Sequence, residues 1–346
     1  MREDIYLCIL VSGTQPTLAV REVENIINGS LEKLSPRIAL LPIRSENLRE
    51  LLAKLYDCVL LQEVIIAKTW IKSTSSDPKF YYDLATKCEW IEVKGKSFAV
   101  SVRKIGGYPS TSSIMLAASV AEAVRVKCGN SCTVNLKDPN VHVRILTSPD
   151  AVVIGIRVLD PRGDRYRFRS KRYKVFRHPA AITPEDAGIM VNLTGRTSPL
   201  LDPFCGSGTI IIEACKRGIE AVGVDVNSAI ARGAAQNLKR FSCDSHGHII
   251  VGNFSMLPFR PSSFTAISTN PPYGRIMKTR EGENIVFEEL TRTATGIVKK
   301  SGKIVFVKPL EGSHPVGEKI EYHYVYVHGG LTRVFCVTRV DPDAEW

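Results

Sequence analysis

The chain has 346 residues, of which 44% are hydrophobic and 23% charged, and its 46 Lys and Arg outnumber 35 Asp and Glu for a net charge of +11. This length allows two or three domains, and no stretch is both long and apolar enough to cross a bilayer. The opening MREDIYLCIL lacks the flanks of a signal peptide, so we expect a cytoplasmic protein. The positive charge favours a polyanionic partner.

Nine cysteines are scattered along the chain, and none forms a C-x-x-C pair. An odd number without that spacing argues against a disulfide framework or a zinc ribbon. Cys243, His246 and His248 lie close together and allow a metal-site interpretation, but their surroundings favour a polar loop between a helix and a strand. We therefore expect no metal.

The first 56 residues predict a small α+β unit without catalytic features. Strands are expected at 5–11 and 37–41, and helices at 18–28 and 45–56. The next segment opens with the apolar run VLLQEVIIAKTWI, which fits either a strand or a helix.

An alternating strand at 97–103 leads to a helix at about 111–127, and three further strands follow at 133–136, 141–146 and 151–158. We expect the buried face of that helix to carry Ile114, Ala118, Ala121 and Val124.

Basic residues are dense between 162 and 177, where eight Arg and Lys alternate with Tyr166, Phe168, Tyr173 and Phe176. Basic residues with interspersed aromatics suit a nucleic-acid backbone and its bases. The alternative is an edge strand with inward aromatics and solubilising charges. We favour RNA contact for this stretch, which also links to the next domain.

From residue 183 the chain alternates helices and strands, which predicts a parallel, doubly wound sheet. Thr183 is a helix N-cap and Pro184 the first helical residue. Helices are expected from 183 to about 193 and at 207–217, 228–240 and 285–300, and strands at 220–224, 248–252, 264–269 and 303–308. A terminal hairpin at 322–328 and 331–338 follows.

The sequence SPLLDPFCGSGTIIIE at 198–213 joins a strand to a helix through a turn that contains Gly206 and Gly208. Glycines there let the backbone approach a ligand closely. The turn has no adjacent Lys and carries Asp202, which argues against a phosphate. Asp225 ends a strand 23 residues after Asp202, about the interval at which an acid takes ribose hydroxyls. A ribose ligand with a cationic amino acid end, such as S-adenosylmethionine, suits this pair.

A second motif, Asn270-Pro271-Pro272-Tyr273, follows the strand at 264–269. Successive prolines fix the backbone, so the carbonyls of Asn270 and Pro271 are held at a rigid angle. Acceptors on the hydrogens of an exocyclic base amine would localise its lone pair for attack on a methyl group. Tyr273 offers a face for stacking the base.

The turn D-P-F-C-G-S-G-T and the motif N-P-P-Y resemble those of class I S-adenosylmethionine-dependent amino-methyltransferases, which act on adenine N6, cytosine N4, guanine N2 or a glutamine amide. The stretch VNLKDPNVHVRILTSPDAVVIGI resembles the THUMP domain of RNA-modifying enzymes. These resemblances imply an α/β chain with a ferredoxin-like unit at 1–56, a THUMP domain at 57–160, a basic linker at 161–182 and a Rossmann-like catalytic domain at 183–346.

The resemblance also implies site residues. Catalysis would rest on Asn270, Pro271, Pro272 and Tyr273. The cofactor would contact His178, Asp202, Phe204, Cys205, Gly206, Gly208, Thr209, Asp225, Val226, Asn253, Phe254 and Asn270. A THUMP domain holds the acceptor end of tRNA, and its phosphates would meet Arg103, Lys104, Lys137, Arg144, Arg167, Arg169, Lys171 and Arg172.

The implied activity is tRNA guanine-N2 methylation by a monomer, with an accessory subunit left open. Enzymes that modify tRNA position 10 more often carry Asp where this chain has Asn270, which favours position 6, with position 10 and ribosomal RNA as alternatives. A DNA adenine-N6 or protein glutamine methyltransferase shares N-P-P-Y but would not need the first 175 residues. A non-catalytic RNA-binding protein is disfavoured because both motifs are intact.

Overall fold

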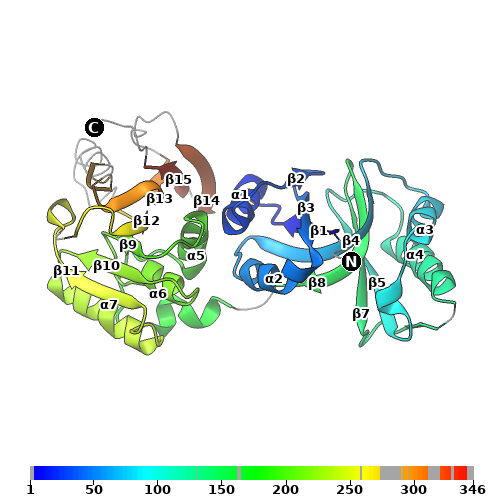
Figure 1. Cartoon of the computed structure of the whole chain (residues 1–346), viewed down its shortest axis with the longest axis horizontal. Helices are drawn as coiled ribbons and strands as arrows, with labels where there is room; N and C mark the ends of the chain where they lie inside the picture. The colour runs from blue at the N-terminus through cyan, green and yellow to red at the C-terminus, as the bar shows by residue number, and fades with distance from the viewer. Residues whose placement is uncertain are drawn as a thin grey trace. The chain divides into compact units, whose positions relative to one another are not determined.

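The computed structural model describes residues 4–129, 131–161, 165–257, 259–272, 290, 292–294, 296–310, 320–328 and 331–340. The chain divides into two compact units (Figure 1). One comprises Met1–Val20, Ser30–Tyr56 and Leu60–Arg162, and the other Arg21–Gly29, Asp57–Val59 and Gly163–Trp346. Among the helices in the described ranges, none combines the length and the hydrophobicity that crossing a bilayer requires.

The first unit contains one eight-stranded sheet in the order β2-β3-β1-β4-β8-β7-β5-β6. Its strands are β1 (Asp4–Val11), β2 (Glu32–Lys33), β3 (Ile38–Arg44), β4 (Leu61–Ile71), β5 (Ser97–Lys104), β6 (Thr133–Val134), β7 (Val141–Thr147) and β8 (Val152–Leu159). The ambiguous apolar run is therefore a strand. Because β4 pairs antiparallel with both β1 and β8, the parts expected at 1–56 and 57–160 share this sheet.

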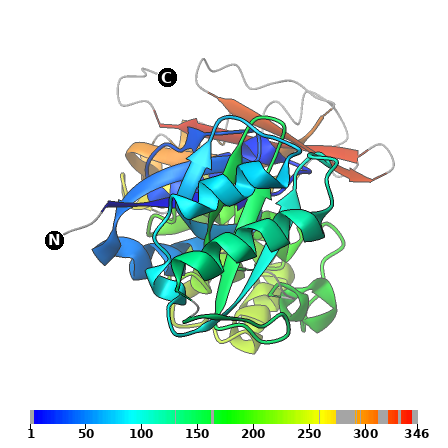
Figure 2. The same ribbon diagram turned by 90° about the vertical axis from the view of Figure 1, so that its right-hand side faces the viewer.

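Four helices accompany these strands in the sequence. They are α1 (Pro16–Ile27), α2 (Leu48–Tyr56), α3 (Pro78–Thr86) and α4 (Ser113–Lys127), with short 3-10 turns η1 (Ser45–Asn47) and η2 (Ile91–Val93). Figure 2 shows α3 and α4 side by side across one face of the sheet. Trp90, Tyr81 and Phe98 are among the fully buried side chains beneath them.

The buried face of α4 differs from the expected one. Leu116, Val120, Ala123 and Val124 are buried, whereas Ile114 is 80% exposed. Ala118 is also exposed, and Ala121 is half-buried. Apolar residues occur around most of this helix, so their spacing does not identify one face; packing against α3 and β5 selects it.

The second unit holds a seven-stranded sheet in the order β11-β10-β9-β12-β13-β15-β14. Its strands are β9 (Leu200–Asp202), β10 (Ala221–Asp225), β11 (Gly247–Val251), β12 (Phe264–Thr269), β13 (Val298–Pro309), β14 (Glu321–His328) and β15 (Leu331–Arg339). β9 to β13 are parallel, while β15 runs antiparallel to β13 and β14. This confirms the predicted α/β sheet with its terminal hairpin.

Three helices precede or follow the first strands of this sheet: α5 (Pro184–Leu193), α6 (Thr209–Cys215) and α7 (Ser228–Arg240). The described part of the unit also contains the short turns η3 (Arg167–Arg169), η4 (Lys171–Tyr173) and η5 (Phe254–Met256). As predicted, Thr183 caps α5, since its hydroxyl accepts from the Asp186 amide at 3.1 Å. α6 and α7 pack on β10 and β11, and α5 packs on α6 (Figure 1).

The helix predicted at 285–300 ends before that range does. Residues 296 and 297 are helical, but β13 begins at Val298, and the preceding part of the range lies largely outside the described residues. The β12–β13 register jumps from Phe264 opposite Val298 to Ala266 opposite Lys303. The polar residues 299–302 thus form an irregularity within β13. The sequence pattern instead predicts a turn at these residues, before the strand begins.

Candidate functional site

The two sequence motifs meet at one edge of the seven-stranded sheet. β9 lies between β10 and β12, and all three run parallel, so their carboxyl ends are adjacent. Strand order reverses at β9, and such a reversal opens a crevice where ligands bind in open α/β sheets. Asp202 ends β9, Asp225 ends β10, and Asn270 follows β12.

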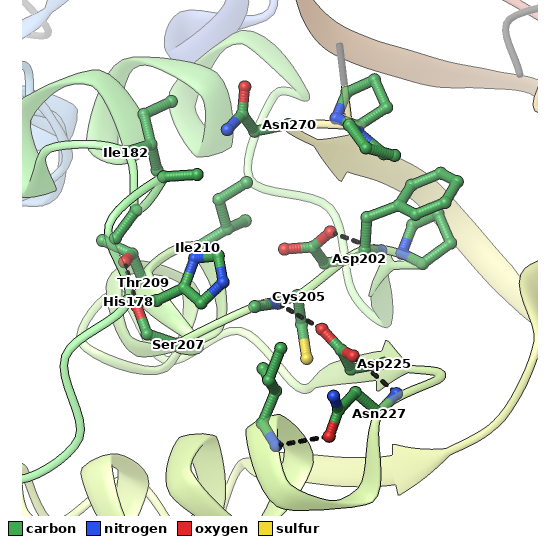
Figure 3. A pocket seen from close by; sticks show the side chains of 18 of the residues that line it. His178, Ile182, Asp202, Cys205, Ser207, Thr209, Ile210, Asp225, Asn227 and Asn270 are labelled. Carbon is green, nitrogen blue, oxygen red and sulfur yellow. Dashed lines mark hydrogen bonds between the residues drawn. The ribbon is translucent and has the colours of Figure 1, made fainter. Parts of the chain in front are cut away.

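A pocket of about 850 Å³ occupies this edge (Figure 3). The predicted site residues that line it are His178, Asp202, Phe204, Cys205, Gly206, Thr209, Asp225, Val226, Asn253, Phe254, Asn270, Pro271 and Pro272. Gly208 shapes the turn without lining the pocket. Tyr273, the expected stacking residue, lies outside the described residues.

The glycine turn depends on backbone conformations that side chains rarely adopt. Gly206 and Gly208 have φ of +51° and +76°. A Cβ on Gly208 would lie 3.1 Å from the Leu238 Cδ1 of α7, a tight contact that a small shift of this side chain would relieve, so the positive φ is the main reason for glycine there. The Cys205 amide donates to the Val224 carbonyl at 2.9 Å, which ties the turn to β10. The loop is therefore fixed in place beside the pocket.

Asp225 faces the turn from the end of β10. One carboxylate oxygen accepts from the Gly206 amide at 3.2 Å, and the other accepts from the Asn227 amide at 2.9 Å. Asn227 itself caps α7, since its side-chain oxygen accepts from the amides of Ala229 and Ile230. The Asp225 carboxylate is thus oriented by backbone donors at the pocket wall and keeps lone pairs for ligand hydroxyls.

Asp202 is buried beneath the pocket, with 1% of its surface exposed. Its Oδ1 accepts from the Thr269 hydroxyl at 2.7 Å and from the Phe204 amide at 3.1 Å. Burial raises the pKa of Asp202 to about 7; these hydrogen bonds oppose the rise, and nearby Asp225 adds to it. A carboxyl held in this way is suited to a cationic ligand group, which would favour its charged form.

Asn270 carries an unsatisfied acceptor. Its side-chain Oδ1 is buried at the pocket, and no group in the described parts of the chain donates to it. Buried acceptors without partners are rare in native proteins because they lose hydrogen bonds to water. Pro271 and Pro272, which follow it, also line the pocket. The position therefore suits a hydrogen-bond donor supplied by a ligand.

Two aromatic rings form another part of the wall. The ring centroids of Phe204 and Phe254 are 4.4 Å apart, with planes inclined by 53°. Asn253 precedes Phe254, and its side-chain oxygen accepts from the amide and the hydroxyl of Ser255 at 3.2 and 3.0 Å. Because its oxygen caps the η5 turn, Asn253 would offer a ligand its amide NH₂ group.

Several pocket-lining residues are absent from the sequence-based site, and three polar residues at or behind the pocket wall are notable among those it missed. Ser207 and Arg333 line the pocket, and Lys174 donates from behind it to the hydroxyls of Ser207 and Thr209. Arg333 pairs with Asp186 of α5, and within the described ranges its buried Nε has no partner. The position of Ser207 between two glycines was an available signal. Lys174 and Arg333 reach the site only through tertiary packing.

The expected phosphate contacts fall into three groups. Lys137, Arg167, Lys171 and Arg172 are exposed. Arg103 and Lys104 are half-buried and donate to the Gln62 side chain and the Thr111 carbonyl. Arg144 and Arg169 form ion pairs.

Arg144 is buried and donates to both carboxylate oxygens of buried Glu63 at 2.5 and 2.9 Å. Arg169 donates to both oxygens of Glu213, a fully buried residue, at 2.6 and 3.2 Å. The prediction is corrected for Arg144, because the buried Glu63 carboxylate needs its cation and the pair leaves no guanidinium for RNA. Arg169 is half-buried and directed at Glu213, a carboxylate that Arg217 also pairs with at 2.7 Å.

Comparison with known proteins finds a matching domain model and relatives that cover most of the chain. The model of the RMKL-like methyltransferase domain matches residues 171–313. A tRNA (guanine(10)-N2)-dimethyltransferase of Methanocaldococcus jannaschii is 30% identical over 255 residues, 69% of this chain and 70% of that protein. A tRNA (guanine(10)-N2)-dimethyltransferase of Pyrococcus abyssi is 27% identical over 274 residues, which are 76% of this chain and 80% of that protein. A tRNA (guanine(6)-N2)-methyltransferase of M. jannaschii is 27% identical over 303 residues, 72% and 77%.

Solved structures show the same fold. TrmN from Thermus thermophilus matches with a TM-score of 0.53 and 20% identity, over 96% of this chain and 99% of that one. SMU.472 complexed with SAH matches with a TM-score of 0.51 and 13% identity, over 97% and 98%. The mixed seven-stranded sheet is therefore a Rossmann-like class I methyltransferase fold.

Proposed function

Since the chain belongs to the family of the tRNA guanine-N2-methyltransferases, we propose that it methylates the exocyclic N2 amine of a guanosine at position 6 of tRNA with S-adenosylmethionine as methyl donor. The observation that carries the proposal is the buried, unpartnered Oδ1 of Asn270 in the pocket that the glycine turn also lines. An exocyclic amine supplies the donor that this acceptor lacks.

The residues present fit the proposed cofactor. Asp225 would accept from ribose hydroxyls, Phe204 and Phe254 would contact the adenine ring, and Asp202 would favour the ammonium of the amino acid end. The glycine turn leaves space for close backbone approach. S-adenosylmethionine supplies an electrophilic methyl group on a sulfonium, so the protein needs no nucleophile of its own.

The chain's own residues then have to orient the amine. Its nitrogen lone pair is delocalised into the guanine ring, which makes it a weak nucleophile. Asn270 Oδ1 and the Pro271 carbonyl would accept from the amine hydrogens and hold the lone pair toward the methyl group. Tyr273 would stack on a base flipped out of its helix.

The position within tRNA rests on the first residue of the second motif. Relatives named for position 10 and for position 6 both match most of the chain. Asn270, rather than Asp, favours position 6, and position 10 or ribosomal RNA are the alternatives.

We assign RNA binding to the N-terminal part, with 57–160 as a THUMP-like module that continues the sheet of 1–56. The exposed cations that support RNA binding are Lys137 in this module and Arg167, Lys171 and Arg172 in the basic linker at 161–182, where all three belong to the second unit. Arg167 and Arg172 also lie 5.9 and 5.0 Å from the rings of Phe168 and Tyr173, so charge and aromatic surface are presented together.

The test is transfer of labelled methyl groups from S-adenosylmethionine to an unmodified tRNA transcript, with the product nucleoside mapped by mass spectrometry. We expect N2-methylguanosine at position 6, lost in Asn270→Ala and in a transcript with adenosine at that position. Label at position 10 would correct the position alone. Label on DNA or a protein glutamine, and none on RNA, would overturn the substrate assignment.

A further inference from the structure

Lys174 is an ammonium buried behind the pocket wall, and 5% of its surface is exposed. It follows the η4 turn, and its Nζ donates to the Ser207 hydroxyl at 3.2 Å and to the Thr209 hydroxyl. Both partners are neutral. A buried charge normally has an ionic partner, because neutral groups replace only part of its hydration.

The carboxylate that acts electrostatically on Lys174, that of Glu213, already accepts hydrogen bonds from other cations. Glu213 lies on α6, and its two oxygens accept from Arg169 and from Arg217, the latter at 2.7 Å. Two guanidinium groups therefore face one buried carboxylate before Lys174 is counted. Within the described residues, the hydrogen-bond acceptors of the Lys174 ammonium are the hydroxyls of Ser207 and Thr209, which favours an anionic ligand group on the pocket side of these hydroxyls.

The ammonium also fixes the direction of the two hydroxyls. Ser207 and Thr209 accept from Lys174, so each has one proton left to donate elsewhere. Their oxygens are 3.4 Å apart, so one can donate to the other, but the other hydroxyl still has a proton to donate to a group outside the pair. Since both residues line the pocket, Lys174 turns this wall into a hydrogen-bond donor.

The donor wall and the acidic residues lie on different sides of the pocket. In Figure 3, Ser207, Thr209 and His178 gather to the left, while Asp202 and Asp225 lie to the right. An amino acid zwitterion presents a carboxylate and an ammonium on one carbon, and this pocket offers donors and a carboxyl to receive them. Burial lowers the pKa of Lys174 to about 8, opposed by Glu213, so the group remains largely charged at neutral pH.

We propose that Lys174 is a positioning residue that acts through Ser207 and Thr209 to hold the α-carboxylate of the cofactor's amino acid end. The inference rests on the proposed function only in taking S-adenosylmethionine as the ligand of this pocket. It assigns Lys174, which belongs to the basic stretch at 162–177, to cofactor recognition. The sequence pattern predicts RNA contact for that stretch.

The test compares two ligands that differ only by the carboxylate: S-adenosylmethionine and decarboxylated S-adenosylmethionine. Their dissociation constants are measured by calorimetry on the full chain without RNA, for wild type, Lys174→Met and Thr209→Val. Lys216→Met is the matched control, since Lys216 is exposed at the far end of α6. Thermal unfolding confirms that each variant is folded.

We expect Lys174→Met to weaken S-adenosylmethionine about tenfold to hundredfold, the range for a charge-assisted hydrogen bond, and to leave the decarboxylated ligand within twofold. Thr209→Val should reproduce this selective loss in smaller measure, and Lys216→Met should change neither constant. Equal losses for both ligands, or none, would overturn the inference and leave the cofactor assignment standing. Failure of the wild type to bind S-adenosylmethionine would overturn both.

Discussion

Asp202 should destabilise the protein at alkaline pH when no cofactor is bound. Its carboxyl is buried, and its pKa is raised from 3.8 to about 7. Between these values the folded state binds more protons than the unfolded chain, so stability falls as pH rises through the folded pKa and is constant above it. From pH 5.5 to 7 the loss is 1.5 units at 1.36 kcal/mol per unit, or about 2 kcal/mol.

Asp202→Asn removes this dependence while keeping an oxygen for the Thr269 hydroxyl and the Phe204 amide. Urea unfolding of wild type and variant at pH 5.5 and 8.5, without cofactor, measures the difference directly. We expect the unfolding free energy of Asp202→Asn, relative to that of the wild type, to rise by about 2 kcal/mol from pH 5.5 to pH 8.5. If the difference in unfolding free energy between wild type and variant is the same at both pH values, Asp202 is ionised at pH 5.5 and the reasoning is refuted.

Four further outcomes are expected. If the ammonium of S-adenosylmethionine lies by Asp202, binding at pH 7 should release protons, detected as buffer-dependent calorimetric heat, and release should vanish at pH 8.5. Asn270→Ala should lower single-turnover methyl transfer about 10² to 10³-fold while cofactor affinity, measured separately, stays near that of the wild type. Arg144→Met should cost about 3 to 5 kcal/mol in urea unfolding, and adding Glu63→Leu should restore most of it; an additive double loss would contradict the buried pair. Lys171→Glu with Arg172→Glu should weaken tRNA binding in filter assays and flatten its salt dependence, whereas unchanged slopes would exclude phosphate contact.

Local sequence determines the parts of the site that depend on local backbone. The glycine turn, the Thr183 cap and the strand-end acids were predictable because each requires particular residues at neighbouring positions. The meeting of Asp202 with Asn270 followed from alternating helices and strands, because parallel strands bring their carboxyl ends together. These features needed no knowledge of distant contacts.

Burial of charged residues was not predictable in the same way. Arg144 and Lys174 look like exposed cations in the sequence, and each is buried because a distant partner, Glu63 or the Ser207–Thr209 pair, receives it. Ile114 on α4 shows the converse, an apolar residue left exposed by packing. Which of these side chains become buried depends on residues far apart in sequence, so hydrophobic periodicity does not predict it.

The shared sheet of the first unit constrains how the protein can be divided. β4 bonds to β1 along one edge and to β8 along the other. A fragment that starts at residue 57 would therefore expose a row of unpaired amides and carbonyls beside the buried Val64 and Ile65. Such an edge is a template for pairing with other chains. We expect the isolated 57–160 segment to self-associate, whereas a fragment that also contains the first 56 residues keeps this edge of β4 paired with β1.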